Sequence, residues 1–336
     1  MKFKSLLLAL IVILAVALTF SACATQEEPP ADDPEDPSIN EPVDQQEAKE
    51  WWEMVDVDWT EASVALDTGI NMTYMVSGPE DGVPIILIHG ATDSRLSWAQ
   101  IVPALADTYR VYVPELRGHG KTDKPDGVDG KYTVAEHTAD IIAFMDAVGI
   151  EKANIAGHSL GSMIAQNLAI DAADKVTTIT LIASGASSVG NETLQWVYDG
   201  DGAEYLGVHG YDDVGALPES FLREWTACTN EDQNFTEAIY LHAAALPYEV
   251  WAYIFGGAME FDNTARLAEI TCPVQIIWGT ADVIFSAEDE QVLRDGLTAA
   301  AEVKFEEIEG ASHNTHWDSQ AIATQVAGLI AAFARE

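Results

Sequence analysis

The pentapeptide Gly157-His158-Ser159-Leu160-Gly161 is the part of the chain whose residue types most clearly suggest chemistry. An apolar run, 153–156, precedes it, and apolar residues at helical spacing follow it. A serine between two glycines at a strand-to-helix turn indicates an exposed nucleophile, because the turn is too tight for side chains at the glycine positions. Free N–H groups at the start of the helix can bind an oxygen that becomes negative during attack. We therefore predict that Ser159 is a nucleophile.

A serine hydroxyl is a poor nucleophile unless a base accepts its proton, and that base needs an acid to hold its tautomer. Asp282 directly follows a predicted strand, 274–278, and His313 directly follows another, 303–308. Both side chains thus come at strand ends, as the serine does. The sequence predicts a Ser-Asp-His triad in that chain order.

Other residues compete for these roles. Asp289 and Asp262 are rivals of Asp282, but neither has the strand-end position. His316 competes with His313, and its spacing from His313 suits one helical turn. We expect His316 at the surface or behind the reacting groups.

The remaining histidines of the motifs have simpler roles. His89, His119 and His158 each neighbour a motif glycine, and we expect them to hydrogen-bond locally rather than react. A metal site would need His, Cys or carboxylates clustered at ligand spacing. Only His313 and His316 come close to such spacing in the sequence, so we predict neither a metal nor another cofactor.

The elements that must position these residues form a repeating pattern of short apolar runs and helical segments. The predicted strands are 64–66, 72–76, 85–88, 111–113, 154–156, 179–182, 274–278 and 303–308, and two clear helical patterns span 134–148 and 322–333. The turn Asp67-Thr68-Gly69 joins the first two strands as a hairpin. The alternation predicts the α/β class with a mostly parallel sheet flanked by helices. Ligands bind such sheets beyond the carboxyl ends of the strands, where the candidate residues lie.

With these motifs in this order, the chain resembles the α/β-hydrolase fold family over about residues 60–336. His89-Gly90-Ala91 stands where that family has its oxyanion loop, and the turn Arg117-Gly118-His119-Gly120 resembles another of its signatures. The resemblance implies that Ser159 attacks a carbonyl and that His313 acts as base and then acid. It also implies that Asp282 supports the imidazolium and that the backbone N–H groups of Ala91 and Leu160 bind the oxyanion.

The domain organisation follows from the same resemblance and from one break in the alternation. Residues 51–185 and 266–336 are the predicted α/β-hydrolase core, and the aromatic-rich stretch 186–265 is the predicted helical cap. The cap either packs as an ordinary insertion or forms an apolar pocket over Ser159, and both are compatible.

The identity of the nucleophile narrows the reaction. Relatives that open epoxides or remove halogens use an aspartate at that position, so Ser159 argues against both. The resemblance then implies hydrolysis of small to medium, apolar carboxylic esters. Lactones, carbon–carbon bonds of diketones, thioesters and perhydrolysis stay open, as does a ligand-binding lipoprotein without turnover.

The N-terminus predicts export. Lys2 and Lys4 precede an apolar run, 6–20, which is short for a membrane span, so residues 1–22 are a predicted signal peptide. Ser21-Ala22-Cys23 resembles the cleavage box of bacterial lipoproteins, which implies a lipid on Cys23 and an extracytoplasmic protein anchored to a membrane. Residues 23–50, rich in proline and acids, are a predicted disordered tether.

Charge and cysteine content set further limits. The formal net charge of −39 argues against nucleic acid as a partner, because the phosphates would be repelled. A small-molecule substrate is the expected partner, and the oligomeric state is open. Cys228 and Cys272 are the other two cysteines; they could pair, but Cys272 precedes an apolar strand and is predicted to be a buried free thiol.

Overall fold

A computed structural model describes residues 53–126, 131–199, 217 and 219–335 of the chain, all within the compact unit Lys49–Glu336. The predicted signal peptide 1–22, Cys23 and the predicted tether 23–50 lie outside the described residues. Within the described part, no helix is long and apolar enough to cross a membrane.

Eight strands form one sheet in the order β1-β2-β4-β3-β5-β6-β7-β8. Their bounds are β1 Thr60–Ala65, β2 Asn71–Ser77, β3 Val83–Ile88, β4 Tyr109–Pro114, β5 Ala153–His158, β6 Val176–Ile182, β7 Val274–Gly279 and β8 Val303–Ile308. β2 pairs antiparallel with β1 and β4, and all pairs from β4 to β8 are parallel. The predicted α/β class, hairpin and mostly parallel sheet are confirmed.

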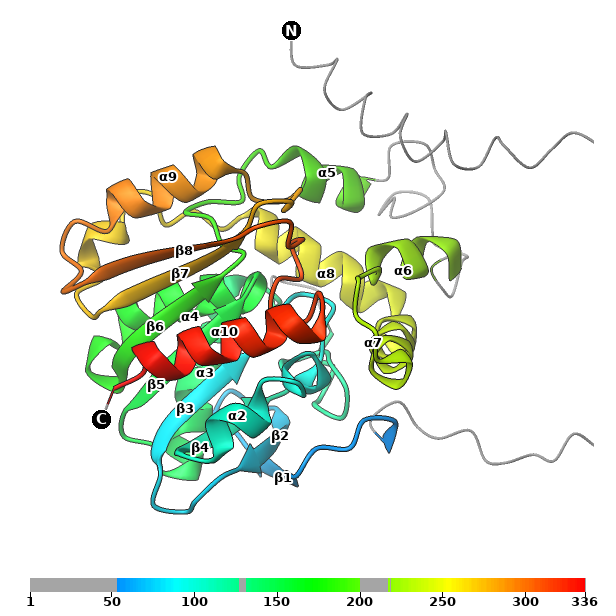
Figure 1. Ribbon diagram of the computed structural model, residues 1–336, viewed down its shortest axis with the longest axis horizontal. Helices are drawn as coiled ribbons and strands as arrows, with labels where there is room; N and C mark the ends of the chain where they lie inside the picture. Colours follow the sequence, from blue (N-terminus) through cyan, green and yellow to red (C-terminus); the bar gives the residue numbers. More distant parts are fainter. Residues whose placement is uncertain (1–52, 127–130, 200–216, 218, 336) are drawn as a thin grey trace, which may run out of the picture. The chain divides into compact units, whose positions relative to one another are not determined.

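Helices cover both faces of the sheet (Figure 1). The helices are α2 Val102–Ala106, α3 Val134–Val148, α4 Leu160–Asp171, α5 Glu192–Asp199, α6 Glu219–Trp225, α7 Gln233–Ala245, α8 Tyr248–Met259, α9 Ala287–Gly296 and α10 Gln320–Phe333, with short 3-10 turns at Arg95–Trp98, Ala173–Lys175 and Leu267–Glu269. Side chains of α3, α4 and α9 belong to one apolar core, and those of α2 and α10 to another.

The alternation of side chains along β3 explains the two cores. Ile86 and Ile88 enter the core under α3 and α4, whereas Ile85 and Leu87 enter the core under α2 and α10. Successive residues of a strand point to opposite faces, so an unbroken apolar run fits a strand covered on both sides. Each core buries complete isoleucine and leucine side chains, each worth roughly 1.5–3 kcal/mol of transfer free energy.

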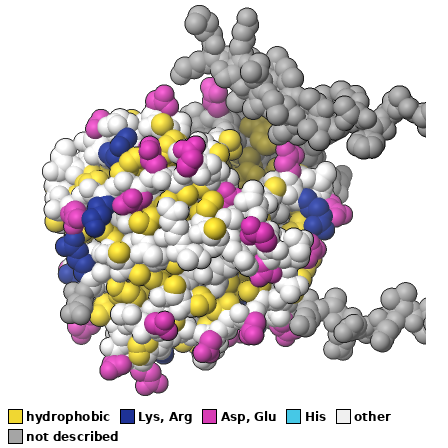
Figure 2. Space-filling view, viewed as in Figure 1, with side chains coloured by type: hydrophobic (Ala, Val, Ile, Leu, Met, Phe, Trp, Pro, Cys, Tyr) yellow, Lys and Arg dark blue, Asp and Glu magenta, His cyan; other side chains and the backbone are white. Residues whose placement is uncertain are grey.

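Four helices, α5 to α8, lie between β6 and β7, within the segment predicted as a cap. Phe221 of α6 and Trp251 and Phe255 of α8 are buried in the same core as α3 and α4. On the face drawn in Figure 2, acidic side chains are scattered rather than gathered in one patch. Cys228 and Cys272 are free, partly buried thiols, and burial raises the pKa of Cys272 to about 11.

Candidate active site

The turn that carries Ser159 is as sharp as the sequence predicts. Ser159 joins β5 to α4 with φ 49° and ψ −114°, a conformation that side chains rarely adopt. A Cβ on Gly157 would lie 2.1 Å from the Gly161 carbonyl oxygen, and one on Gly161 would lie 2.2 Å from that of Ile88. Both glycines are therefore required by close backbone approach, and the strain at Ser159 fits a functional position.

Asp282 and His313 meet at the ends of β7 and β8. Nδ1 of His313 lies 3.0 Å and 2.9 Å from the two carboxylate oxygens of Asp282. Asp282 is fully buried, and its Oδ1 also accepts the N–H groups of Ile284 and Phe285 at 2.7 Å and 3.1 Å. The carboxylate is thus fixed by the backbone, and it holds the His313 proton on Nδ1, which leaves Nε2 able to accept one.

Ser159 and His313 line one pocket, together with Ala91 and Leu160. No hydrogen bond joins the Ser159 hydroxyl to the His313 ring among the described residues. Such bonds are often long in ligand-free enzymes and tighten when substrate binds. Within the same part of the chain, no acceptor takes the backbone N–H of Ala91 or of Leu160. Both N–H groups are therefore available to an oxygen bound beside Ser159.

Helices α5, α6 and α8 supply apolar walls to the pocket. The wall residues are Leu194, Trp225, Phe255 and Ala258, with Met163 and Ile284 from the core. The Trp225 indole N–H donates to the Thr92 hydroxyl at 2.7 Å, which connects α6 to the loop after β3. The sequence did not indicate which aromatic residues of 186–265 face the pocket; the structure identifies Trp225 and Phe255.

The turn Arg117-Gly118-His119-Gly120 supports the loop that carries Ala91. The Arg117 guanidinium contacts both oxygens of Asp140, at 2.6 Å and 2.7 Å. Nε2 of His119 lies 2.7 Å from the Ala91 carbonyl oxygen. His89 donates from Nδ1 to the Gly90 carbonyl and accepts the Leu116 N–H at Nε2. The expectation that His89 and His119 hydrogen-bond locally is confirmed, and the contacts fix the position of the Ala91 backbone.

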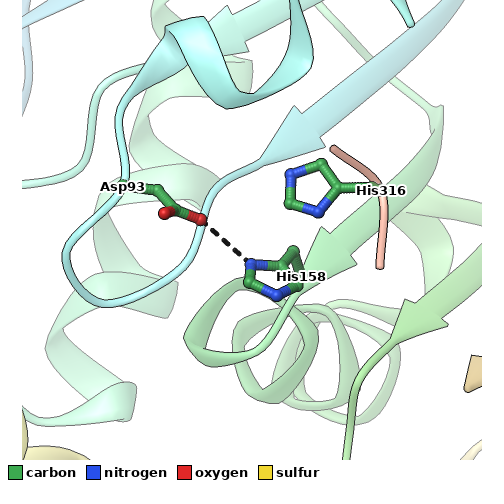
Figure 3. Close-up of side chains that lie close together, drawn as sticks. All are labelled: Asp93, His158 and His316. Carbon is green, nitrogen blue, oxygen red and sulfur yellow. Dashed lines mark hydrogen bonds and ion pairs between the residues drawn. The ribbon is translucent and has the colours of Figure 1, made fainter. Parts of the chain in front are cut away.

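At the edge of the pocket, whose lining includes Asp93 and His158, lies a group of residues that the sequence analysis did not bring together. A carboxylate oxygen of Asp93 and one ring nitrogen each of His158 and His316 lie within 4.8 Å of one another, and all three residues are buried (Figure 3). The rings of His158 and His316 have centroids 4.3 Å apart. His316 is fully buried, so a surface position for it is wrong and its place behind the reacting groups is correct. The sequence grouped His313 with His316 as the nearest approach to a metal site; the structure instead groups His316 with His158 and Asp93.

Burial dominates the titration of the groups around the site. It lowers the pKa of His316 well below 6.5, with the neighbouring His158 and His313 acting in the same direction. It raises the pKa of Glu290 on α9 to about 9, helped by the negative charge of Asp282. At neutral pH, His316 is therefore uncharged and Glu290 is protonated.

The chain belongs to the alpha/beta hydrolase fold family, whose pattern matches residues 83–320. A protein of Variovorax paradoxus provisionally named carbamate hydrolase RutD is 29% identical over 228 residues, which are 67% of this chain and 83% of that protein. The 3-oxoadipate enol-lactonase 1 of Acinetobacter baylyi is 26% identical over 231 residues, 68% of this chain and 82% of that enzyme. A solved hydrolase structure from Pseudomonas aeruginosa has a TM-score of 0.69 at 20% identity, covering 82% of this chain and 98% of that one. These relatives support a hydrolase and leave the bond that it cleaves unassigned.

Proposed function

We propose that the protein is a serine hydrolase that cleaves small to medium, apolar carboxylic esters through an acyl-enzyme. The observation that carries the proposal is the contact between the His313 imidazole and the buried Asp282 carboxylate, in the pocket that contains the strained Ser159. A nucleophile, a base and an acid that orients the base form the arrangement that acyl transfer requires.

The proposed reaction proceeds in two halves. The Ser159 hydroxyl attacks the ester carbonyl while His313 Nε2 accepts its proton, and the oxyanion binds the N–H groups of Ala91 and Leu160. The imidazolium then protonates the departing alcohol, which leaves an acyl group on Ser159. A water molecule, deprotonated by the same nitrogen, releases the acid and restores the serine. Asp282 stays ionised and holds the imidazolium throughout.

The walls of the pocket support an apolar substrate. Leu194, Phe255, Ala258 and Ile284 present hydrocarbon surface beside Ser159. Their burial against an alkyl or aryl group contributes about 25 cal/mol per Å² of apolar surface removed from water. These four side chains carry no charge, so they favour the apolar part of a substrate.

The test of this proposal is Ser159→Ala, with Ser63→Ala on β1 as the matched control. The Ser63 hydroxyl is hydrogen-bonded to the Thr73 hydroxyl at 3.3 Å. Ser63 lies on β1, at the opposite edge of the sheet from β8. Ser159→Ala is expected to abolish p-nitrophenyl acetate cleavage and covalent labelling by a fluorophosphonate, whereas Ser63→Ala retains both. Full activity in the Ser159→Ala variant would remove the proposed nucleophile.

Lactone opening is the second candidate, because one of the relatives is an enol-lactonase. The same three side chains would act, and only the leaving group would differ, since the released alcohol stays joined to the acyl part. A panel of linear esters and lactones of matched carbon number distinguishes the two: the proposed esterase has the higher kcat/KM on linear esters.

We also propose that the protein is exported and held at a bacterial membrane by a lipid on Cys23. The support is the apolar run 6–20 followed by Ser21-Ala22-Cys23. Cys23→Ser is expected to move the protein from the membrane fraction to the soluble extracytoplasmic fraction. Unchanged sedimentation would contradict the anchor.

A further inference from the structure

The loop after β3, the end of β5 and the loop after β8 meet at one buried carboxylate. The Asp93 Oδ2 atom lies 3.0 Å from Nδ1 of His158 and accepts the Gly90 N–H at 3.3 Å. On the other side of the ring, Nε2 of His158 lies 2.9 Å from the backbone carbonyl oxygen of His313. Figure 3 shows Asp93 and His158 joined in this way, with His316 beside them. One pair of side chains thus connects the loop of Ala91, the turn of Ser159 and the loop of the proposed base.

The His158 ring is held at both of its nitrogens. Because a carbonyl oxygen only accepts, Nε2 of His158 carries the proton of its hydrogen bond to the His313 carbonyl, and Nδ1 makes the second hydrogen bond, to the Asp93 carboxyl group. The side chains of His158 and Asp93 are 2% and 9% exposed, so water cannot replace a lost bond at low cost.

Other rings enclose the pair. The titratable groups that face the His158 ring are Asp93, His316 and His313. His316 is uncharged, for the reason given above, and its ring lies between those of His158 and Trp98. A buried pair whose partners are also hydrogen-bonded to the backbone is held firmly, and removing one partner leaves a buried polar group without its hydrogen bond.

The pair is also built into the backbone. A Cβ on Gly90 would lie 2.7 Å from His158 Nδ1 and 2.9 Å from Asp93 Oδ2. The loop therefore has room for the pair only because residue 90 is a glycine. This loop also presents the Ala91 N–H to the pocket, so its position and that of the pair are linked.

We propose that Asp93 and His158 are positioning residues of the hydrolase: the Asp93–His158 pair holds the His313 backbone from behind while Asp282 holds its imidazole from the other end. The inference rests on the proposed function, in which His313 is the base. Both residues border the pocket, and in this proposal both act through the placement of His313 and of the Ala91 loop.

Kinetics of variants test this role. His158→Phe and Asp93→Ala are each expected to lower kcat on p-nitrophenyl acetate by on the order of 10²-fold with little change in KM, because a displacement of about 1 Å at a base has that effect. The double variant is expected to be no worse than either single one, since both break one network. His158→Gln keeps an N–H donor for the His313 carbonyl and is expected to recover about tenfold of the loss. The control is His137→Phe: His137 is also fully buried, and neither of its ring nitrogens has a hydrogen-bond partner in the described part of the chain, so kcat is expected to stay unchanged.

A folded His158→Phe variant with full kcat would overturn the proposal, as would a His158→Gln variant no better than His158→Phe. Where the Phe variant does not fold, the ring ¹⁵N spectrum of the Ser159→Ala protein at pH 7 decides. The Nε2 atom of His158 is expected to carry a proton that is hydrogen-bonded to a backbone carbonyl, and an unprotonated Nε2 overturns the assignment. Stoichiometric zinc in the purified protein, with His158 signals that shift when it is chelated, would also overturn it. This spectrum does not depend on catalytic activity, so it can contradict the proposed Asp93–His158 pair even where the proposed esterase function is wrong.

Discussion

Two histidine–carboxylate pairs lie at this site, and their difference explains what each can do. In the outer pair, Nδ1 of His313 lies 2.9 Å from a carboxylate oxygen of Asp282. In the inner pair, Nδ1 of His158 lies 3.0 Å from a carboxylate oxygen of Asp93. The other nitrogen differs: Nε2 of His158 faces the carbonyl of His313, whereas Nε2 of His313 has no hydrogen-bond partner among the described residues. The His313 side chain is 12% exposed and that of His158 only 2%. A general base needs one ring nitrogen without a hydrogen-bond partner, as in His313. A residue that only positions its neighbours can have both ring nitrogens hydrogen-bonded, as in His158.

Asp282→Asn gives the largest expected effect. An asparagine at this place favours the tautomer that puts the His313 proton on Nε2, where it cannot accept one from Ser159. We expect kcat on p-nitrophenyl acetate to fall by about 10⁴-fold with little change in melting temperature. Asp93→Asn is the matched comparison and is expected to lose far less, because it acts only through position. Equal losses in the two variants would contradict the division of roles.

Much of the arrangement of Ser159 and the outer pair, His313 and Asp282, could be predicted from the sequence, because the sequence signals are local. Ser159 has a glycine two residues away on each side, and Asp282 and His313 each follow a predicted strand. A parallel sheet brings strand ends to one edge, so strand-end residues far apart in sequence can be expected to meet. The geometry of β5, β7 and β8 agrees with that expectation.

The contact within the inner pair, His158 and Asp93, could not be predicted in the same way. Asp93 and His158 are 65 residues apart, and their contact depends on β3 lying beside β5 rather than on any local pattern. The sequence left His316 either at the surface or behind the reacting groups, and its packing against Trp98 buries it. The contact between Trp225 and Thr92 depends likewise on how α6 lies over the loop after β3. Glycine at 90, next to a strand end, was the only local sign that something packs closely there.

A buried acid beside the outer pair predicts a stability effect at high pH. The pKa of Glu290 is raised from 4.5 to about 9, first by burial and then by the charge of Asp282. Between these values the unfolded chain ionises this side chain and the folded protein does not, so stability falls as pH rises. The loss is on the order of 4 kcal/mol between pH 5 and pH 8. Glu290→Gln removes this titration, and urea unfolding is expected to show the variant gaining on the wild type as pH rises; parallel pH profiles would contradict it.

A buried base beside the inner pair predicts the opposite dependence. The pKa of His316 is well below 6.5 in the folded protein, so below pH 6.5 only the unfolded chain takes up a proton there. Stability from this group is complete above pH 6.5 and is lost as pH falls below that value. His316→Phe keeps a ring against Trp98 and lacks the titration. Urea unfolding is expected to show a flatter profile for this variant between pH 5 and pH 7, and an unchanged slope would argue against a neutral buried ring.

Gly90→Ala gives the smallest expected effect and addresses the inner pair most directly. The new methyl group would approach both His158 Nδ1 and Asp93 Oδ2 to less than 3.0 Å, so the pair must separate or the loop must shift. We expect kcat to fall by about tenfold. Gly328→Ala is the control: Gly328 is exposed on the outer side of α10 with no atom near a new Cβ, and the change should leave kcat unchanged and raise helix stability by roughly 0.5–1 kcal/mol. A shift of the Ala91 loop alone would leave the ring ¹⁵N signals of His158 unchanged, whereas separation of the pair changes them. If Gly90→Ala lowers kcat without altering those signals, the loop matters to hydrolysis independently of the pair, and the coupling between them is wrong.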